Sequence, residues 1–289
     1  DEDVSQPGDF VKVVRFLMRW MSDADRAKLP VSFIEAHAKL ALHTRKAHTW
    51  ARAVPWYVFL NDVAPWASLT EPRTPAFRLD TTVRAFLASL LKAAAPTTSG
   101  EAAMVLNKGA WGVVQPPIVF DAAPPCEINS YGPFETMQRH NSSCTGLAVL
   151  LVDCLRMCGV PARVAGVPHW NMGPELCPEG DASPACANHN WVEIYDTGTH
   201  SWSFVDQLGD LRLNHSWFHP SHTHQAVPVS LNHSLYASSF ADPFWLMKHD
   251  PAYRRNGMSP SYSGFPLVWE WGDRSVRAWD VTEVYSPIS

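Results

Sequence analysis

The chain has 289 residues, of which 46% are hydrophobic and only 18% charged, and its formal net charge is −5. This composition excludes an intrinsically disordered protein and a coiled coil, because both need a far larger share of charged residues. It also argues against nucleic-acid and anionic-membrane partners, which require a basic surface. No stretch reaches the roughly 18 uninterrupted apolar residues of a membrane-spanning helix.

Residues 1–106 are predicted to form a helical N-terminal region. Apolar residues recur there at helical spacing in three segments. The segments are Phe10 to Trp20, Phe33 to Leu42 and Val83 to Leu91. Prolines interrupt the stretch between the last two, so Trp56 to Phe77 is predicted to be one short helix followed by an ordered loop. We expect this region to pack on the remainder of the chain as one compact unit.

Residues 107–289 are predicted to form a catalytic core that combines one apolar helix with short strands. The helix runs from Cys144 to Cys158 and is ended by Gly159, just before Pro161. The strands are predicted from alternating β-branched and aromatic residues. They cover Ala162 to Val167, Asn190 to Asp196, Ser201 to Val205, Leu267 to Trp271 and Val276 to Val284. Ser216 to Ser239 is rich in His, Ser and Pro and is predicted to be a long loop.

Cys144 is a candidate nucleophile because it is the first residue of the predicted helix. It follows Asn141, Ser142 and Ser143, which are residue types that cap helices. The positive end of the helix dipole favours a thiolate at this position and lowers the pKa of the thiol. The unpaired backbone amides at the start of the helix are also able to stabilise an oxyanion.

His189 and Asp206 are candidate partners of Cys144. His189 directly precedes the second predicted strand, and Asp206 directly follows the third. A turn at Thr197 to Thr199 would join these strands into a hairpin whose open end brings His189 and Asp206 together. The order Cys, His, Asp therefore predicts a catalytic triad. Taken singly, a buried thiol, an ordinary histidine and a strand-terminal aspartate are the plainer interpretations.

These residues lie in blocks that resemble the transglutaminase-like superfamily. The blocks are Ser-Cys-Thr-Gly-Leu at 143–147, Leu-Val-Asp at 151–153, Gly-Val-Pro-Ala-Arg-Val-Ala-Gly at 159–166, Asn-His-Asn-Trp-Val-Glu at 188–193 and Trp-Ser-Phe-Val-Asp at 202–206. Residues 33–73 and the tail, with Trp217 and Phe218 and the segments 265–269 and 281–282, are similar to bacterial-type transglutaminase-like proteins of unassigned substrate.

The resemblance implies an α+β fold with a papain-like core, in which the nucleophile helix packs on an antiparallel sheet. It implies a cysteine-dependent amide hydrolase or acyltransferase, with Cys144 as nucleophile, His189 as general acid and base, and Asp206 as the residue that orients the histidine. The substrate would be a peptide or small amide, with an amine co-substrate in a transfer reaction and no cofactor. A biosynthetic condensation, cyclisation or elimination enzyme and a non-catalytic secreted binding glycoprotein are the alternatives.

The remaining cysteines and the sequons suggest a secretory-pathway protein. Asn141, Asn214 and Asn232 begin Asn-X-Ser sequons, and any targeting segment is expected to lie outside this sequence. A disulfide between Cys177 and Cys186 is predicted, with two reduced thiols as the alternative. Cys154 and Cys158 are interpreted as packed core thiols. Whether Cys126 forms a disulfide with either of them is left open.

Further residues are candidates for binding. The rings of Trp111, Tyr131, Trp170 and Trp191 would wall an apolar cleft, with core packing as the alternative. Glu71 and Arg73 would read the charged ends of a small substrate, with a solvated salt bridge as the alternative. Four histidines crowd a loop, but without an HExxH motif we expect a polar loop and no metal site. They are His215, His219, His222 and His224.

Overall fold

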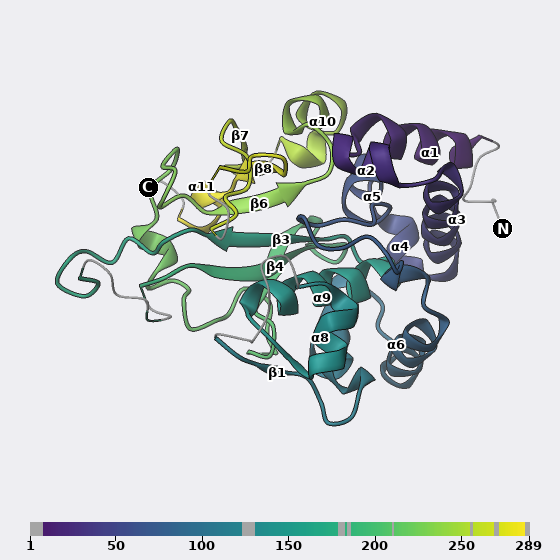
Figure 1. Ribbon diagram of the computed structural model, residues 1–289, viewed down its shortest axis with the longest axis horizontal. Coiled ribbons are helices and arrows are strands. Elements are labelled where there is room, and N and C mark those ends of the chain that lie inside the picture. Colours follow the sequence, from purple (N-terminus) through teal and green to yellow (C-terminus); the bar gives the residue numbers. More distant parts are fainter. Residues whose placement is uncertain are drawn as a thin grey trace.

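The protein is built around one six-stranded antiparallel sheet, which confirms the predicted α+β class (Figure 1). The computed structural model describes residues 8–122, 131–178, 183, 186–209, 211–254, 257–268 and 272–286. The strand order is β5-β4-β3-β6-β8-β7. The strands are β3 (Ala162–Val167), β4 (His189–Asp196), β5 (Ser201–Val205), β6 (Tyr236–Ser239), β7 (Ser259–Ser261) and β8 (Arg277–Asp280). A separate parallel pair joins β1 (Val119–Phe120) to β2 (Asn141–Ser142).

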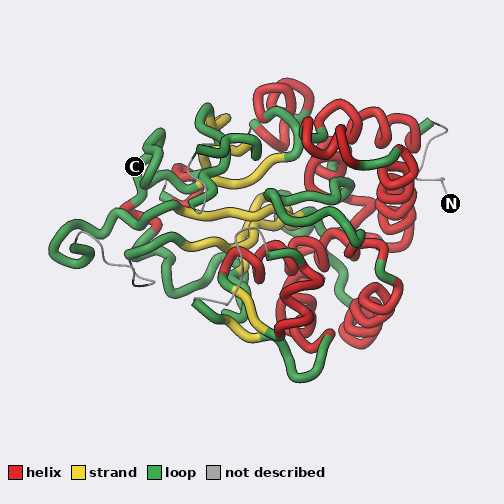
Figure 2. Tube along the Cα trace, in the orientation of Figure 1, coloured by secondary structure: helices red, strands yellow, loops and turns green. Residues whose placement is uncertain are grey.

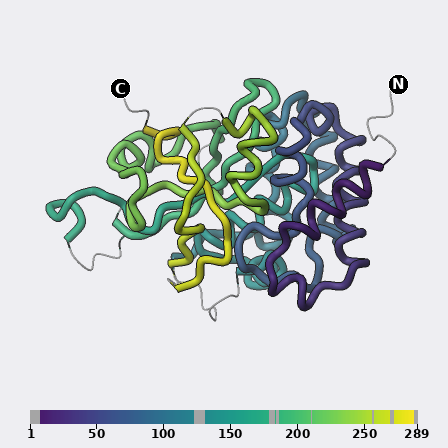
Figure 3. The backbone as a smooth tube through the Cα atoms, turned by 90° about the horizontal axis from the view of Figure 1, so that it is seen from above, coloured from purple at the N-terminus to yellow at the C-terminus, as the bar shows by residue number. Residues whose placement is uncertain are grey.

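Helices cover the sheet and gather at the N-terminal side of the molecule (Figures 2 and 3). The N-terminal helices are α1 (Asp9–Trp20), α2 (Asp23–Lys28), α3 (Val31–Ala47), α4 (Thr49–Ala53), α5 (Trp56–Asp62), α6 (Thr81–Ala94) and α7 (Ser99–Gly109). The later helices are α8 (Pro133–Arg139), α9 (Cys144–Met157), α10 (Pro243–His249) and α11 (Thr282–Tyr285). Helices α7 and α9 contact strand β4 directly.

Strand alternation places two hydrophobic cores on opposite faces of the sheet. Val192 and Ile194 of β4 face the core that contains α9, whereas Trp191 and Tyr195 face the core that contains α1, α3 and α5. Successive side chains of a strand point to opposite faces, so one strand supplies both cores. Both faces of β4 are therefore covered, and its first residue, His189, lies at the end of a rigid element.

Helix α9 is the most buried helix and confirms the apolar helix predicted from Cys144. Every residue from Thr145 to Met157 is buried, and the apolar residues among them pack into the first core. Gly159 follows the helix with a φ of 73°, a conformation that glycine adopts without a steric penalty. Helix α9 is thus held along its length, and only its first turn reaches the surface.

The local periodicity predicts some elements well and others poorly. Helices α1, α3 and α6 confirm the three predicted helical segments, and β3 and β5 have the predicted bounds. The strand predicted from Leu267 was wrong at Leu267 and Val268, which are not in a strand, and its last three residues lie outside the described residues. The run predicted up to Val284 leaves the sheet at Asp280 and continues as α11. The predicted loop 216–239 ends in strand β6.

Helix α7 joins the helical region to the sheet. It runs across residue 106, so the backbone has no break at that position. Its N-terminus is fixed to the end of β4, where the amide of Gly100 donates to Asp196 Oδ1 at 3.1 Å and the hydroxyl of Ser99 donates to the Tyr195 carbonyl at 2.7 Å. The other end of α7 reaches the segment that follows β5, as described below.

Candidate active site

Cys144, His189 and Asp206 come together where the first turn of α9 meets the ends of β4 and β5. The Nε2 of His189 lies 3.2 Å from Asp206 Oδ1, and the imidazole also hydrogen bonds with the Cys144 thiol. Hairpin pairing explains the first contact, because Val192 pairs with Val205 and the two strands therefore end side by side. With Nε2 used by Asp206, the Nδ1 atom of the ring is left for the thiol.

The environment of Cys144 favours its thiolate. Burial alone raises the pKa of the thiol, but hydrogen bonds from His189, from the Asn190 backbone amide and from Thr145 outweigh burial and bring the pKa below its ordinary value. The side chain of Ser143, which precedes the helix, makes no cap hydrogen bond to the first amides of α9. Cys144 is also partly exposed to solvent, as a nucleophile must be.

The imidazole of His189 favours its charged form. Burial lowers its pKa, but hydrogen bonds with Asp206 and Cys144 more than compensate and raise the pKa to about 9. A lowered thiol pKa beside a raised imidazole pKa favours a thiolate–imidazolium pair near neutral pH. The two side chains therefore hold the charges that a cysteine nucleophile and its proton donor need.

Asp206 is fixed from two further sides. The Ser216 hydroxyl donates to Asp206 Oδ2 at 2.7 Å, so each carboxylate oxygen of Asp206 accepts one hydrogen bond. The Asn107 side chain, on α7, donates to the Asp206 carbonyl at 3.0 Å. All three residues are buried, which strengthens these contacts. The sequence analysis missed Ser216 and Asn107, since both are distant in sequence and belong to no local pattern.

Two buried amides hold the nucleophile segment. The Asn190 side chain donates to Thr145 Oγ1 at 2.6 Å, and Gln207 donates to the carbonyls of Cys144 and Asn190 at 3.1 and 2.6 Å. Asn190 has room to do so because its partner in the sheet is Gly166, where a Cβ would lie 2.0 Å from Asn190 Oδ1. The sequence analysis missed both amides, although each directly follows a predicted triad residue.

Comparison with protein families agrees with this arrangement. Residues 118–207 match the family model of the transglutaminase-like superfamily. Residues 118–207 thus form a transglutaminase-like domain. The superfamily is one of cysteine-based acyltransferases and hydrolases. No curated protein and no solved structure matches the chain significantly.

An aromatic layer lies beneath the predicted triad. Trp191 and Trp170 are 0% and 1% exposed, and their rings stack with centroids 6.1 Å apart. The centroid of the Trp191 ring also lies 6.0 Å from that of the His189 imidazole. The Nε1 of Trp191 donates to the Tyr285 hydroxyl at 2.7 Å. These two predicted cleft residues therefore lie in the core beneath His189.

The other two predicted cleft aromatics also lie inside the protein. Trp111 belongs to the first core, and its Nε1 donates to the Asn107 carbonyl at 2.5 Å. Asn107 in turn donates to the Asp206 carbonyl, so Trp111 contacts Asp206 only through Asn107. Tyr131 is buried in the same core, and its hydroxyl hydrogen bonds with Thr70. The side chains of Trp111 and Tyr131 thus pack against the α9 side of the sheet.

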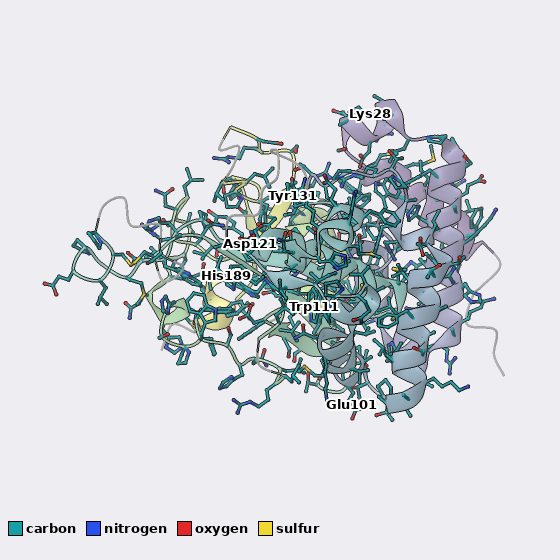
Figure 4. The ribbon with its side chains drawn as sticks, turned by 60° about the horizontal axis from the view of Figure 1, so that its bottom comes forward. Lys28, Glu101, Trp111, Asp121, Tyr131 and His189 are labelled. Atoms are coloured by element: carbon teal, nitrogen blue, oxygen red, sulfur yellow. A yellow bond between two sulfur atoms is a disulfide. The ribbon has the colours of Figure 1, made fainter. Side chains whose placement is uncertain are left out.

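Glu71 and Arg73 lie in a different place from the triad. Glu71 accepts from the amides of Ser68 and Leu69, and Arg73 pairs with Glu71 and with Asp25 at 3.4 and 3.1 Å. Both line an open cavity of about 770 Å³ that no triad residue lines. Lys28, another lining residue, lies well away from His189 (Figure 4).

The cysteines divide into two kinds. Cys177 and Cys186 form a disulfide with a Cα–Cα distance of 5.4 Å, in the loop that leads from β3 to β4. Cys154 and Cys158 are free and buried in the first core. Cys126 lies outside the described residues.

The three sequons differ in exposure. Asn232 is exposed, and Asn141 is partly exposed in β2. Asn214 is also exposed, but its side chain binds strand β5, accepting from the Phe204 amide at 2.9 Å and donating to Ser203 Oγ at 3.2 Å.

The described residues contain neither a metal-binding cluster nor a membrane-spanning helix. Across the described residues, no group of three or more His, Cys, Asp and Glu side chains is arranged to hold a metal ion. Within the histidine-rich loop, His219 hydrogen bonds with Thr223 and His215 with Arg212. Among the same described residues, no helix combines the length and apolarity needed to cross a bilayer.

Proposed function

We propose that this protein is a cysteine-dependent amide hydrolase or acyltransferase that acts on a peptide or small amide. The observation that carries the proposal is the hydrogen-bonded series Cys144, His189, Asp206 and Ser216, in which the thiol pKa is lowered and the imidazole pKa is raised. In this proposal Cys144 is the nucleophile, His189 the acid and base, and Asp206 the orienting group.

The proposed reaction has two halves. The Cys144 thiolate attacks the amide carbonyl, the carbon–nitrogen bond breaks, and His189 gives its proton to the leaving nitrogen. Water or an amine then attacks the thioester, His189 removes a proton from it, and the thiolate leaves. The first amides of α9 are free of a side-chain cap and would stabilise the oxyanion in both halves.

The state of Cys144 favours catalysis over a purely binding role. A non-catalytic relative would tolerate a Cys144 disulfide or a nucleophile without its base, whereas this thiol is free and hydrogen bonds with His189. We further propose that residues 1–106 and 107–289 act as one unit, since helix α7 supplies Asn107 to the Asp206 backbone.

A secretory location is also part of the proposal. The disulfide between Cys177 and Cys186 is of the kind that persists in an oxidising compartment. Asn232 is the sequon best placed to carry a glycan, because it is exposed, whereas the side chain of Asn214, which is also exposed, hydrogen bonds with strand β5. Expression in a secretory host, followed by peptide mass mapping of the three sequons, tests this part separately from catalysis.

The catalytic proposal is tested with a library of peptides and amines. Mass spectrometry of the products after incubation distinguishes hydrolysis, which adds water, from transfer, which adds an amine. We expect at least one such product from the wild type and none from Cys144→Ala. Turnover that survives in Cys144→Ala would overturn the assignment.

A further inference from the structure

Trp217 displays a half-exposed ring beside His189. Its side chain is 46% exposed, and its ring centroid lies 5.3 Å from that of the imidazole. The rings of Trp191 and Phe218 also lie near His189, with centroids 6.0 and 5.2 Å from that of the imidazole, but both are fully buried. Of these three aromatic neighbours of His189, Trp217 is the one that a substrate can touch.

The backbone of Trp217 is anchored on both sides. Ser216 is 6% exposed and donates to Asp206 Oδ2, while Phe218 is 0% exposed and packs against Trp191 at 4.7 Å between centroids. The two neighbours thus attach the segment to the triad itself. Trp217 lies between them with its side chain directed outward, so its position is coupled to that of His189 and Asp206.

The ring of Trp217 is also held by its own contacts. Trp170, Phe218 and His222 meet it edge-on, with centroids 6.2, 5.6 and 5.1 Å away. These contacts preorganise the indole and leave much of its surface in solvent. A rigid aromatic ring that stays exposed is suited to bind a group of matching chemistry, because little side-chain entropy remains to be lost.

The chemistry of His189 decides which part of the substrate meets this ring. In the proposed function, on which this inference rests, His189 protonates the leaving nitrogen and later deprotonates the incoming water or amine. That nitrogen must come within about 3 Å of the imidazole for the proton to move. A substituent on the nitrogen therefore lies within reach of the ring that flanks the imidazole on its exposed side.

We infer that Trp217 binds the amine portion of the substrate and favours an apolar or aromatic group there. The same ring would receive the amine co-substrate in a transfer reaction, since both amines pass the same imidazole. Trp217 is then a specificity-determining residue, distinct from the triad that makes and breaks bonds.

Two thiol reagents test this inference without a known substrate. Iodoacetamide and iodoacetanilide both alkylate a cysteine, and they differ by one phenyl group on the amide nitrogen. The rate constants of both reagents at Cys144 are measured by peptide mass spectrometry for the wild type, Trp217→Ala, Trp217→Phe and the control Tyr262→Ala. Tyr262 is a suitable control because it is an aromatic residue with 89% exposure outside the site described above.

We expect Trp217→Ala to lower the ratio of the iodoacetanilide rate to the iodoacetamide rate by about fivefold, the size of one aromatic pair contact. The iodoacetamide rate itself should stay within about twofold, because the thiol and imidazole are untouched. Trp217→Phe keeps a ring and should lose only part of the preference. Tyr262→Ala should leave the ratio unchanged.

The possible failures are distinguishable. An unchanged ratio in Trp217→Ala, or an equal loss of both rates, would mean that Trp217 does not contact the amine substituent, and would overturn the inference alone. Slow alkylation of wild-type Cys144 by both reagents would instead overturn the proposed function together with this inference. Trp217→Phe keeps the test decisive if the alanine variant folds poorly.

Discussion

Helix α9 carries Cys144 and Cys154, and Cys158 directly follows it; the two ends of the helix give these thiols opposite properties. At its start, Cys144 is partly exposed and its thiol pKa is lowered by hydrogen bonds from His189, Asn190 and Thr145, which outweigh the effect of burial. Towards its end, burial raises the pKa of the Cys154 thiol well above its ordinary value and that of Cys158 to about 12.

The difference follows from what surrounds each sulfur. Cys154 and Cys158 lie among apolar side chains of the first core, where burial raises the pKa of each thiol and, at Cys158, outweighs the opposing charges of Arg84 and Arg78. Cys144 lies at the positive end of the helix dipole and beside a cationic imidazole. The start of α9 therefore holds the expected nucleophile, and two thiols expected to be inert lie near and just after its end. Position rather than residue type decides between them.

Removing Cys144 should have the largest effect. Cys144→Ala is expected to lower turnover by at least about a thousandfold and to eliminate rapid alkylation by iodoacetamide near neutral pH. Cys154→Ala, from the same helix, and Cys158→Ala, from the residue that caps its end, are matched controls. They should retain the fast reaction because a buried, protonated thiol does not contribute to it. Fast alkylation that persists in Cys144→Ala would place the reactive thiol elsewhere.

Removing the imidazole should make Cys144 resemble the other two thiols. His189→Ala deletes the hydrogen bond and charge that lower the Cys144 pKa and leaves the effect of burial, so the thiol pKa should rise. We expect the alkylation rate at pH 7 to fall about 10- to 100-fold, in proportion to the lost thiolate. Stopped-flow alkylation measures this. A rate equal to that of the wild type would contradict the thiolate–imidazolium pair.

Neutralising Asp206 should shift the pH profile. Asp206 helps to raise the pKa of His189 to about 9, so Asp206→Asn should lower that pKa. Turnover requires the imidazolium as proton donor, and the falling alkaline limb near pH 9 in the wild type should therefore move to lower pH. The rate at pH 7 should drop roughly a hundredfold. An alkaline limb that stays in place in the pH–rate profile would contradict this role.

The smallest effect is expected from Ser216. Ser216→Ala removes one buried hydrogen bond to Asp206 Oδ2, a contact of about 1 kcal/mol, and should lower turnover about fivefold. Ser89→Ala, which removes an exposed hydroxyl on α6, serves as the control. Equal turnover in the two variants would show that Ser216 does not position Asp206.

Local sequence patterns predicted the elements that carry the triad. The apolar run after Cys144 ends at Gly159 and Pro161, and the alternating residues of β4 and β5 flank a short turn, so the ends of all three elements could be located. The structure also joins Cys177 to Cys186, the pairing favoured by their spacing.

The parts that depend on distant contacts were not predictable in this way. Strand β6 has only four residues, and its position in the sheet comes from pairing with β3 and β8 rather than from its own periodicity. Ser216 and Asn107 reach Asp206 from the loop after β5 and from α7, and nothing in their neighbouring residues indicates this. Trp217 became a candidate specificity residue only because its ring lies beside the His189 imidazole, a contact between distant parts of the sequence.

The pH dependence of alkylation at the cysteines in and directly after α9 tests the central claim most directly. Iodoacetamide rate constants at Cys144, Cys154 and Cys158 are measured across pH 5 to 10 on the same protein and resolved by peptide mass spectrometry. We predict that Cys144 reacts with an apparent pKa below the ordinary value of about 8.5, while Cys154 and Cys158 stay unreactive in the folded protein. An apparent pKa for Cys144 at or above that value, or equal reactivity of the three thiols, would contradict the assignment of Cys144 as nucleophile.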